Sequence, residues 1–225
     1  MISHYKIIHT SCNIQWESIE KRIFNESVWM EQNEHQIIII APKESPLYLK
    51  AKQHGFKVYG IEFKFFSRIK DYKLLKAIFY NEKPDIVNTH GDKDSQIALH
   101  AAKNSSVPLR ILSRHINTLV RNSWYNRLVY KKFCHYIFTG DDSITMHLQK
   151  VFRLNRMKIF SMPDGLIMPD HEKTELFINE KELDDTGDNI LSEQQYTINT
   201  MGRNIIRIYS LHQIKLNQGK NPEYY

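Results

Sequence analysis

Cysteine and long apolar runs are both scarce in this chain of 225 residues. Only Cys12 and Cys134 are present, too few and too far apart for a disulfide framework, so we expect a reducing, cytoplasmic location. The longest purely aliphatic run covers residues 37–40, whereas a membrane-spanning helix needs about 20 apolar residues. No apolar segment of a signal peptide follows the first residues. These absences argue against a disulfide-rich secreted protein and against an integral membrane protein.

Several catalytic and cofactor motifs are also missing. No Gly-x-Gly-x-x-Gly follows the first predicted strand, so ordinary dinucleotide binding has no support. The phosphate-binding Gly-x-x-x-x-Gly-Lys-Ser/Thr, the hydrolase Gly-x-Ser-x-Gly and the zinc-binding His-Glu-x-x-His are absent as well. With two isolated cysteines and no ligand-spaced histidines, we predict neither a metal site nor a cofactor.

The charge is unevenly distributed along the chain. Residues 1–169 carry 25 Lys and Arg against 15 Asp and Glu, whereas residues 170–225 carry 6 against 10. A basic body indicates an anionic partner: a phosphate-bearing ligand, an acidic membrane surface or nucleic acid. The alternative is that the excess positive charge is merely spread over a solvated surface.

One stretch, residues 121–132, combines basic and aromatic side chains. Its Trp124, Leu128 and Lys131 have the spacing of an ordinary amphipathic helix, so we expect no nucleic-acid binding. Tryptophan, tyrosine and lysine are favoured where a helix meets a membrane surface, and peripheral membrane contact is the better hypothesis for this stretch.

Apolar strands and amphipathic helices alternate along the first three quarters of the chain. The predicted strands cover residues 5–10, 36–41, 57–61, 85–89, 109–112, 135–139 and 158–160. The predicted helices cover residues 18–33, 46–54, 72–81, 95–103, 124–133 and 143–152. This alternation predicts an α/β fold, a Rossmann-like doubly wound parallel sheet with a short C-terminal extension. In the extension we expect an acidic linker over residues 170–193, a strand over 196–200 and a helix over 204–216.

Ligands of such sheets bind at the carboxyl ends of the strands, where the strand order reverses. Polar residues follow the predicted strands in segments 11–18, 88–92, 113–117, 139–142 and 161–165. His90, Arg114 and His115 therefore converge on one edge, where a polar ligand would be bound. The alternatives are that each histidine only caps its strand, that Arg114 is simply exposed, and that residues 163–165 form a turn.

In this order, the strand-end segments resemble the N-terminal domain of family 4 glycosyltransferases of the GT-B fold. The segments that carry the resemblance cover residues 6–11, 19–22, 84–91, 112–115 and 161–165. The resemblance implies one half of a two-domain, retaining and generally metal-independent sugar transferase, with residues 1–169 as the acceptor-side domain. It also implies that His115 is the catalytic residue near the reacting sugar.

The resemblance further implies substrate-binding residues in the same cleft: His90, Gly91, Arg114, Gln15, Trp16 and Glu17. The family usually has a Gly-Gly pair in the first loop, where this chain has Gln15-Trp16-Glu17-Ser18, so phosphate binding there should be weakened. We expect the donor domain to be missing, with residues 170–225 a linker or the remnant of its start. Thr200-Met201-Gly202-Arg203 faintly resembles the first strand end of that domain.

Two functions follow as hypotheses. The first is a glycosyltransferase-like acceptor domain of bacterial surface polysaccharide or lipopolysaccharide synthesis. It would bind a sugar or a lipid-linked acceptor in the cytoplasm or at the inner face of the membrane. It would meet a nucleotide-sugar only if a second domain or chain supplies the donor site, and it would otherwise be inactive. The second is a non-catalytic module that binds a sugar or a lipid headgroup.

Overall fold

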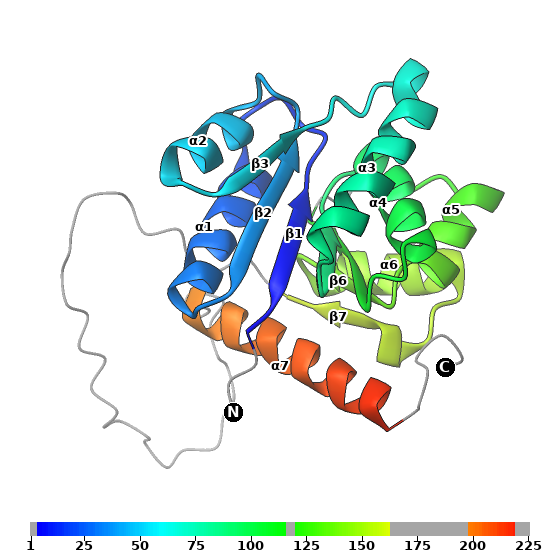
Figure 1. Ribbon diagram of the computed structural model, residues 1–225. Coiled ribbons are helices and arrows are strands. Elements are labelled where there is room, and N and C mark those ends of the chain that lie inside the picture. The colour runs from blue at the N-terminus through cyan, green and yellow to red at the C-terminus, as the bar shows by residue number, and fades with distance from the viewer. Residues whose placement is uncertain (1–3, 116–119, 163–197, 219–225) are drawn as a thin grey trace, which may run out of the picture.

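The computed structural model describes residues 4–115, 120–162 and 198–218 of the chain. Seven parallel strands form one sheet in the order β3-β2-β1-β4-β5-β6-β7, with helices on both faces (Figure 1). This is the predicted doubly wound Rossmann-like sheet, and the prediction is confirmed. The strands are β1 (Lys6–Thr10), β2 (Gln36–Ala41), β3 (Lys57–Gly60), β4 (Ile86–Thr89), β5 (Leu109–Arg114), β6 (Tyr136–Thr139) and β7 (Ile159–Ser161).

The helices match the predicted ones to within a few residues, except near the C-terminus. They are α1 (Ser18–Gln32), α2 (Pro46–His54), α3 (Arg68–Glu82), α4 (Asp92–Asn104), α5 (Trp124–Leu128), α6 (Asp142–Phe152) and α7 (Ile198–Asn217). Two short 3₁₀ turns, η1 (Phe65–Ser67) and η3 (Arg156–Lys158), precede α3 and β7. The helix predicted over residues 124–133 is α5 followed by one π-helical turn, η2 (Val129–Phe133).

Strand β2 shows why the sheet is covered on both faces. Side chains of a strand point alternately to opposite faces. Ile37 and Ile39 belong to one buried apolar cluster, and Ile38 and Ile40 belong to another. A run of four isoleucines is therefore what a strand between two helical layers requires.

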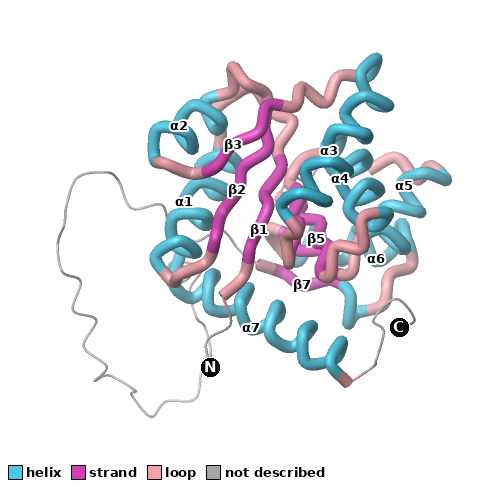
Figure 2. Tube along the Cα trace, in the orientation of Figure 1, coloured by secondary structure: helices cyan, strands magenta, loops and turns pink. Residues whose placement is uncertain are grey.

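The two helical layers differ in how the chain builds them. Helices α1 and α2 cover the β1–β3 side of one face, whereas α3, α4, η2 and α6 pack on the other face. Every crossover described after β3 therefore lies on the second face, which leaves β4–β6 to be covered on the first. Helix α7 provides this cover through Met201, Ile205 and Tyr209, which belong to the same buried cluster as α1 and β5. Figure 2 shows α7 running alongside the sheet next to α1.

Helix α7 corrects one expectation and confirms another. The strand predicted over residues 196–200 is wrong, because residues 198–200 are the first turn of α7. Residues 200–203 are likewise helical and do not end a strand. The helix predicted over residues 204–216 is present and longer, while the linker predicted over 170–193 lies outside the described residues. The division at residue 169 stays a prediction, although α7 packs into the core of the preceding sheet.

No helix in the described part of the chain is long and apolar enough to cross a membrane.

Candidate functional site

The strand order reverses between β1 and β4, and a cavity of about 550 Å³ opens at their carboxyl ends. The chain runs outward from β1 to β3 and returns to β4, so the loops after β1 and β4 diverge and leave a crevice. The loops after β3 and β5 complete its walls. The lining residues are Ser11, Cys12, Asn13, Ile14, Ile19, Glu20, Glu62, Phe63, Lys64, His90, Gly91, Asp92, Lys93, Arg114 and His115. Four of the predicted site residues, His90, Gly91, Arg114 and His115, are therefore brought together.

Three histidines stand side by side at this edge, one from each of three neighbouring strands. His9 of β1 has its Nδ1 3.0 Å from Nε2 of His90, which follows β4. The ring of His90 in turn stacks on that of His115, with centroids 5.8 Å apart and planes 20° apart. His9, which sequence reasoning missed, is fully buried behind the two histidines that line the cavity.

Burial keeps these imidazoles neutral. It lowers the pKa of His9 to about 3, because a charged ring would lose its hydration. Burial also lowers the pKa of His90 and His115 well below the usual value, and the nearby Arg22 guanidinium adds to both shifts. A neutral imidazole carries one donor and one acceptor, so a bonded pair leaves one of each unused. Within the described residues, His9 Nε2 and His90 Nδ1 have no hydrogen-bond partner.

Gly91 is required by the close packing behind the cavity. A Cβ at this position would lie 2.4 Å from Asp94 Oδ1 and 2.7 Å from Cys12 Sγ. Asp94 cannot easily move away, because its Oδ2 accepts hydrogen bonds from Thr10 Oγ1 at 2.6 Å and from the His90 amide at 3.3 Å. Burial and the neighbouring carboxylate raise the pKa of the Cys12 thiol to about 12, so this thiol stays protonated and is no nucleophile.

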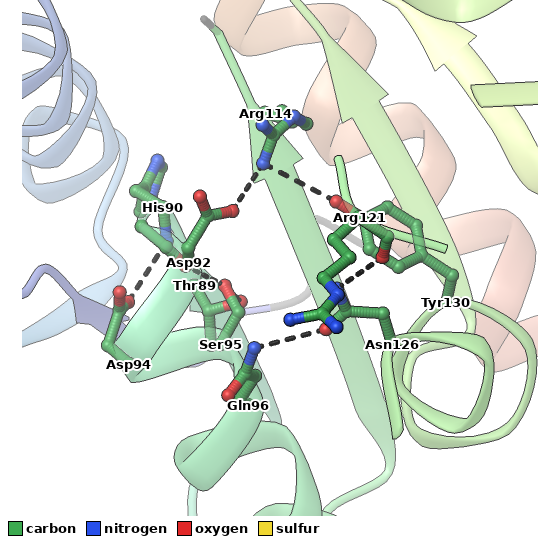
Figure 3. Close-up of polar contacts among 11 residues, drawn as sticks. Thr89, His90, Asp92, Asp94, Ser95, Gln96, Arg114, Arg121, Asn126 and Tyr130 are labelled. Atoms are coloured by element: carbon green, nitrogen blue, oxygen red, sulfur yellow. Dashed lines mark hydrogen bonds and ion pairs between the residues drawn. The ribbon is translucent and has the colours of Figure 1, made fainter. Parts of the chain in front are cut away.

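Arg114 contributes a buried positive charge to the wall. Its guanidinium pairs with the carboxylate of Asp92 and lies 3.5 Å from the hydroxyl of Tyr130 (Figure 3). The two partners differ in burial, with 8% of the Arg114 side chain exposed against 64% of that of Asp92. Beyond this pair lies a second cavity of about 210 Å³. Its polar lining includes Ser95, Gln96, Arg121 and Asn126, also drawn in Figure 3.

The other three predicted site residues do not line the cavity. Gln15 is exposed to solvent, and Glu17 occupies the N-cap position of α1. Trp16 packs edge-on against Phe24 at 6.1 Å, with the Lys50 ammonium 5.1 Å from the centre of its ring.

The part of the first loop that lines the cavity is its start, residues 11–14. Glu20 accepts hydrogen bonds from Ser11 Oγ and Asn13 Nδ2, both at 3.1 Å, and this fixes the loop against α1. The useful signal for Cys12 and Asn13 was their position immediately after β1. Phe63 and Lys64, from the loop after β3, carried no signal that sequence reasoning used.

The described residues contain no group of three or more His, Cys, Asp and Glu side chains arranged to hold a metal ion.

Solved structures of glycosyltransferases share this fold. A glycosyltransferase from Rickettsia africae matches 72% of the chain at 14% identity, with a TM-score of 0.59. The lipopolysaccharide outer core galactosyltransferase WaaB matches 73% at 13% identity, with a TM-score of 0.56. The Anabaena protein HepE, in complex with UDP and glucose, matches 72% at 11% identity, with a TM-score of 0.54. The chain therefore shares the fold found in part of these glycosyltransferase structures.

The match covers only part of those proteins. The chain spans 44%, 46% and 45% of the Rickettsia, WaaB and HepE structures, less than half of each. No known protein family matches the sequence, and no curated protein matches it. Identities this low establish the fold, so the reaction has to be argued from the site.

Proposed function

We propose that this chain is the acceptor-side half of a retaining, nucleotide-sugar-dependent glycosyltransferase of the family 4 type. The observation that carries the proposal is the cavity where the strand order reverses, lined by His90, Arg114 and His115 in a fold shared with glycosyltransferases. The acceptor would be a sugar or a lipid-linked sugar of bacterial surface polysaccharide or lipopolysaccharide synthesis. The reaction would take place in the cytoplasm or at the inner face of the membrane.

The chemistry of the wall suits a polyol. A sugar hydroxyl both donates and accepts hydrogen bonds, and each neutral imidazole offers one donor and one acceptor. His90 and His115 would orient acceptor hydroxyls, with His115 nearest the reacting sugar. Arg114, held by Asp92, would pair with a phosphate or another anionic group of the acceptor. Gly91 would place the backbone at the start of α4 beside the ligand.

The donor would be bound by a second domain or a second chain. HepE was solved with UDP-glucose, and this chain spans 44% of that structure. A UDP-sugar or GDP-sugar held by that second domain or chain would face the cavity and present its anomeric carbon to the acceptor. By this proposal the chain alone binds acceptor but transfers nothing.

Calorimetric titration separates these roles. We expect no tight binding of UDP- or GDP-sugars by this chain alone, and millimolar or tighter binding of a glycan with terminal glucose, galactose or N-acetylglucosamine. Exchange of His115 for Ala should weaken glycan binding at least tenfold, because it removes a hydrogen-bonding ring from the wall. His147→Ala, on α6, is the matched control and should bind normally. Tight nucleotide-sugar binding, or unchanged glycan binding by the H115A variant, would contradict the proposal.

A non-catalytic sugar or lipid-headgroup binding module is the second candidate. The loop after β1 favours it, because Glu17-Ser18 stands where the glycine pair of an active relative is expected. Restoring two glycines there and supplying a donor domain should restore transfer if the chain is half of an enzyme. A module that has lost the chemistry would still bind glycan and would gain no activity.

A further inference from the structure

Helix α3 and the turn before it expose large apolar side chains to solvent. Phe66 is 98% exposed, Ile69 76% and Tyr80 77%. The inner side of the same helix is already packed, with Leu75, Ile78 and Phe79 buried against the sheet. Single exposed apolar residues are normal on a protein surface, but several along one element mark an interaction site.

The charge on this face is predominantly positive, although Lys64 Nζ lies 3.9 Å from the exposed carboxylate of Glu62. Lys64, Lys70, Lys73 and Lys76 are exposed there, and between residues 63 and 81 the one acidic residue is Asp71. Asp71 is buried and accepts a hydrogen bond from Ser67 Oγ at 2.5 Å, so it does not neutralise the outer face. At 3.6 residues per turn, Ile69, Lys73, Lys76 and Tyr80 form one stripe along the outside of the helix. We call the exposed side chains of Phe66, Ile69, Tyr80 and these four lysines the α3 face.

The α3 face adjoins the cavity. Lys64 lines the cavity and precedes Phe66 by two residues. Figure 1 shows the segment between β3 and α3 crossing the edge of the sheet toward which β1 points. Ile14, also strongly exposed, lines the same cavity from the loop after β1. A flat partner resting on the α3 face would therefore lie next to the cavity mouth.

From this arrangement we infer that the α3 face docks the protein on an anionic lipid bilayer, with the cavity opening beside the headgroups. Aliphatic and aromatic side chains flanked by lysines enter the boundary between headgroups and acyl chains. Tyrosine is favoured at headgroup level, and lysines near the surface are attracted to anionic lipids. Nucleic acid fits less well, because Ile69 offers a base neither stacking nor charge. Docking would bring a lipid-linked acceptor to the site of the proposed function, but it does not depend on that function.

The contacts of Arg68 hold the first turn of α3 in place. Its Nη2 donates to Gln96 Oε1 at 2.8 Å, and its guanidinium lies 5.8 Å from the centre of the Tyr125 ring. The first turn of α3 is therefore tied to α4 and α5, so the exposed side chains are presented from a rigid element.

Vesicle sedimentation tests the inference with the whole chain. We expect binding to vesicles of 60% phosphatidylcholine and 40% phosphatidylglycerol, and little binding to pure phosphatidylcholine. A K70E/K73E/K76E variant should bind about 100-fold more weakly, since each lysine near an anionic surface contributes several-fold. An F66S/I69S/Y80S variant should also lose binding. Thermal melting of each variant checks that it folds, which is expected because these side chains are exposed.

The matched control is the other basic and aromatic surface, around Trp124, which is 74% exposed. A W124S/K131E/K132E variant should keep its binding. Loss of binding in this variant with retention in the α3 variants would overturn the inference and favour α5. Failure of the native protein to bind anionic vesicles would overturn it as well and leave a protein partner for the α3 face. Because no glycan is present, failure here is separate from failure of glycan binding.

Discussion

Two groups of buried histidines lie at opposite ends of the parallel strands, and they differ in how completely they are hydrogen-bonded. We call the end where the strands begin the amino edge and the end where they finish the carboxyl edge. At the amino edge, His135 Nδ1 accepts from the Arg110 amide at 3.1 Å, and its Nε2 lies 3.0 Å from Arg110 Nη2. His212 of α7 lies with Nε2 3.0 Å from Pro108 O and Nδ1 3.4 Å from the Tyr136 hydroxyl. Every ring nitrogen of this pair has a partner within the protein. The cluster joins β5, β6 and α7.

At the carboxyl edge the network is open. His9 and His90 share one hydrogen bond, and each keeps a buried nitrogen without a partner among the described residues. Such groups cost stability, since a buried polar atom left unpaired loses its hydration without compensation. The difference teaches that burial of a histidine does not reveal its role. A closed network stabilises the fold, whereas the open one lies beside the cavity, where under the proposed function a ligand would bind.

The largest expected effect comes from breaking the closed cluster. Arg110→Leu removes donors to Phe133 O at 2.8 Å and Val107 O at 2.9 Å, and it also removes the side-chain partner of His135 Nε2. We expect the free energy of unfolding to fall by about 4 kcal/mol, because several buried acceptors are left unsatisfied. Urea denaturation measures this loss. A decrease below about 1 kcal/mol would show that the amino-edge network is not what stabilises this edge.

A smaller loss of stability is expected when a methyl group is added at the carboxyl edge. In Gly91→Ala the new methyl group meets Asp94 and Cys12, and overpacking of this kind costs about 2 kcal/mol. The same change shifts the start of α4 and should reduce glycan affinity, which Arg110→Leu should not do in molecules that stay folded. Denaturation and calorimetry on both variants separate the two edges. Full stability and full affinity in the G91A variant would contradict the packing argument.

The third effect, the smallest of the three near neutral pH, is expected for the buried histidines of both edges and appears in the pH dependence of stability. Burial lowers the pKa of His9 to about 3 and that of His135 to about 2, so the unfolded chain binds more protons than the folded one below pH 6.5. Stability is therefore complete above pH 6.5 and falls as the pH drops, by at most about 1.4 kcal/mol per pH unit for each histidine.

The variants His9→Gln and His135→Gln should each reduce that slope by about this amount between pH 6 and pH 4. An unchanged slope in either buried variant would show that the ring is charged in the folded protein.

Much of the fold was predictable because strand and helix periodicities alternate clearly from Lys6 to Ser161. The start of helix α7 was harder to predict, because the side chains of residues 196–200 have the alternating pattern of a strand. Met201, Ile205 and Tyr209 follow one another at four-residue spacing, and they match a sheet face left uncovered by the crossovers after β3. The uncovered face exists only once the strands and crossover helices have come together, so no local sequence pattern indicates it.

The site was predictable where a residue directly follows a strand. His90, Gly91, Arg114 and His115 line the cavity for this reason, because parallel strands end at one edge. Farther along the first loop the rule fails, since Gln15 is exposed, Trp16 packs against Phe24 and Glu17 caps α1. His9 was not singled out because it lies inside β1, and its bond to His90 depends on which strands become neighbours.

Nitrogen-detected NMR of the histidine rings tests most directly the claim that the open edge is the ligand site. The chain, labelled at its imidazole nitrogens, would be titrated with glycans ending in glucose, galactose or N-acetylglucosamine, free and lipid-linked. At least one glycan should shift the resonances of His90 and His115, leave those of His135 and His212 in place, and fail to shift His90 in the H115A variant. Shifts confined to the amino-edge histidines, or no shift with any of these glycans, would contradict the account.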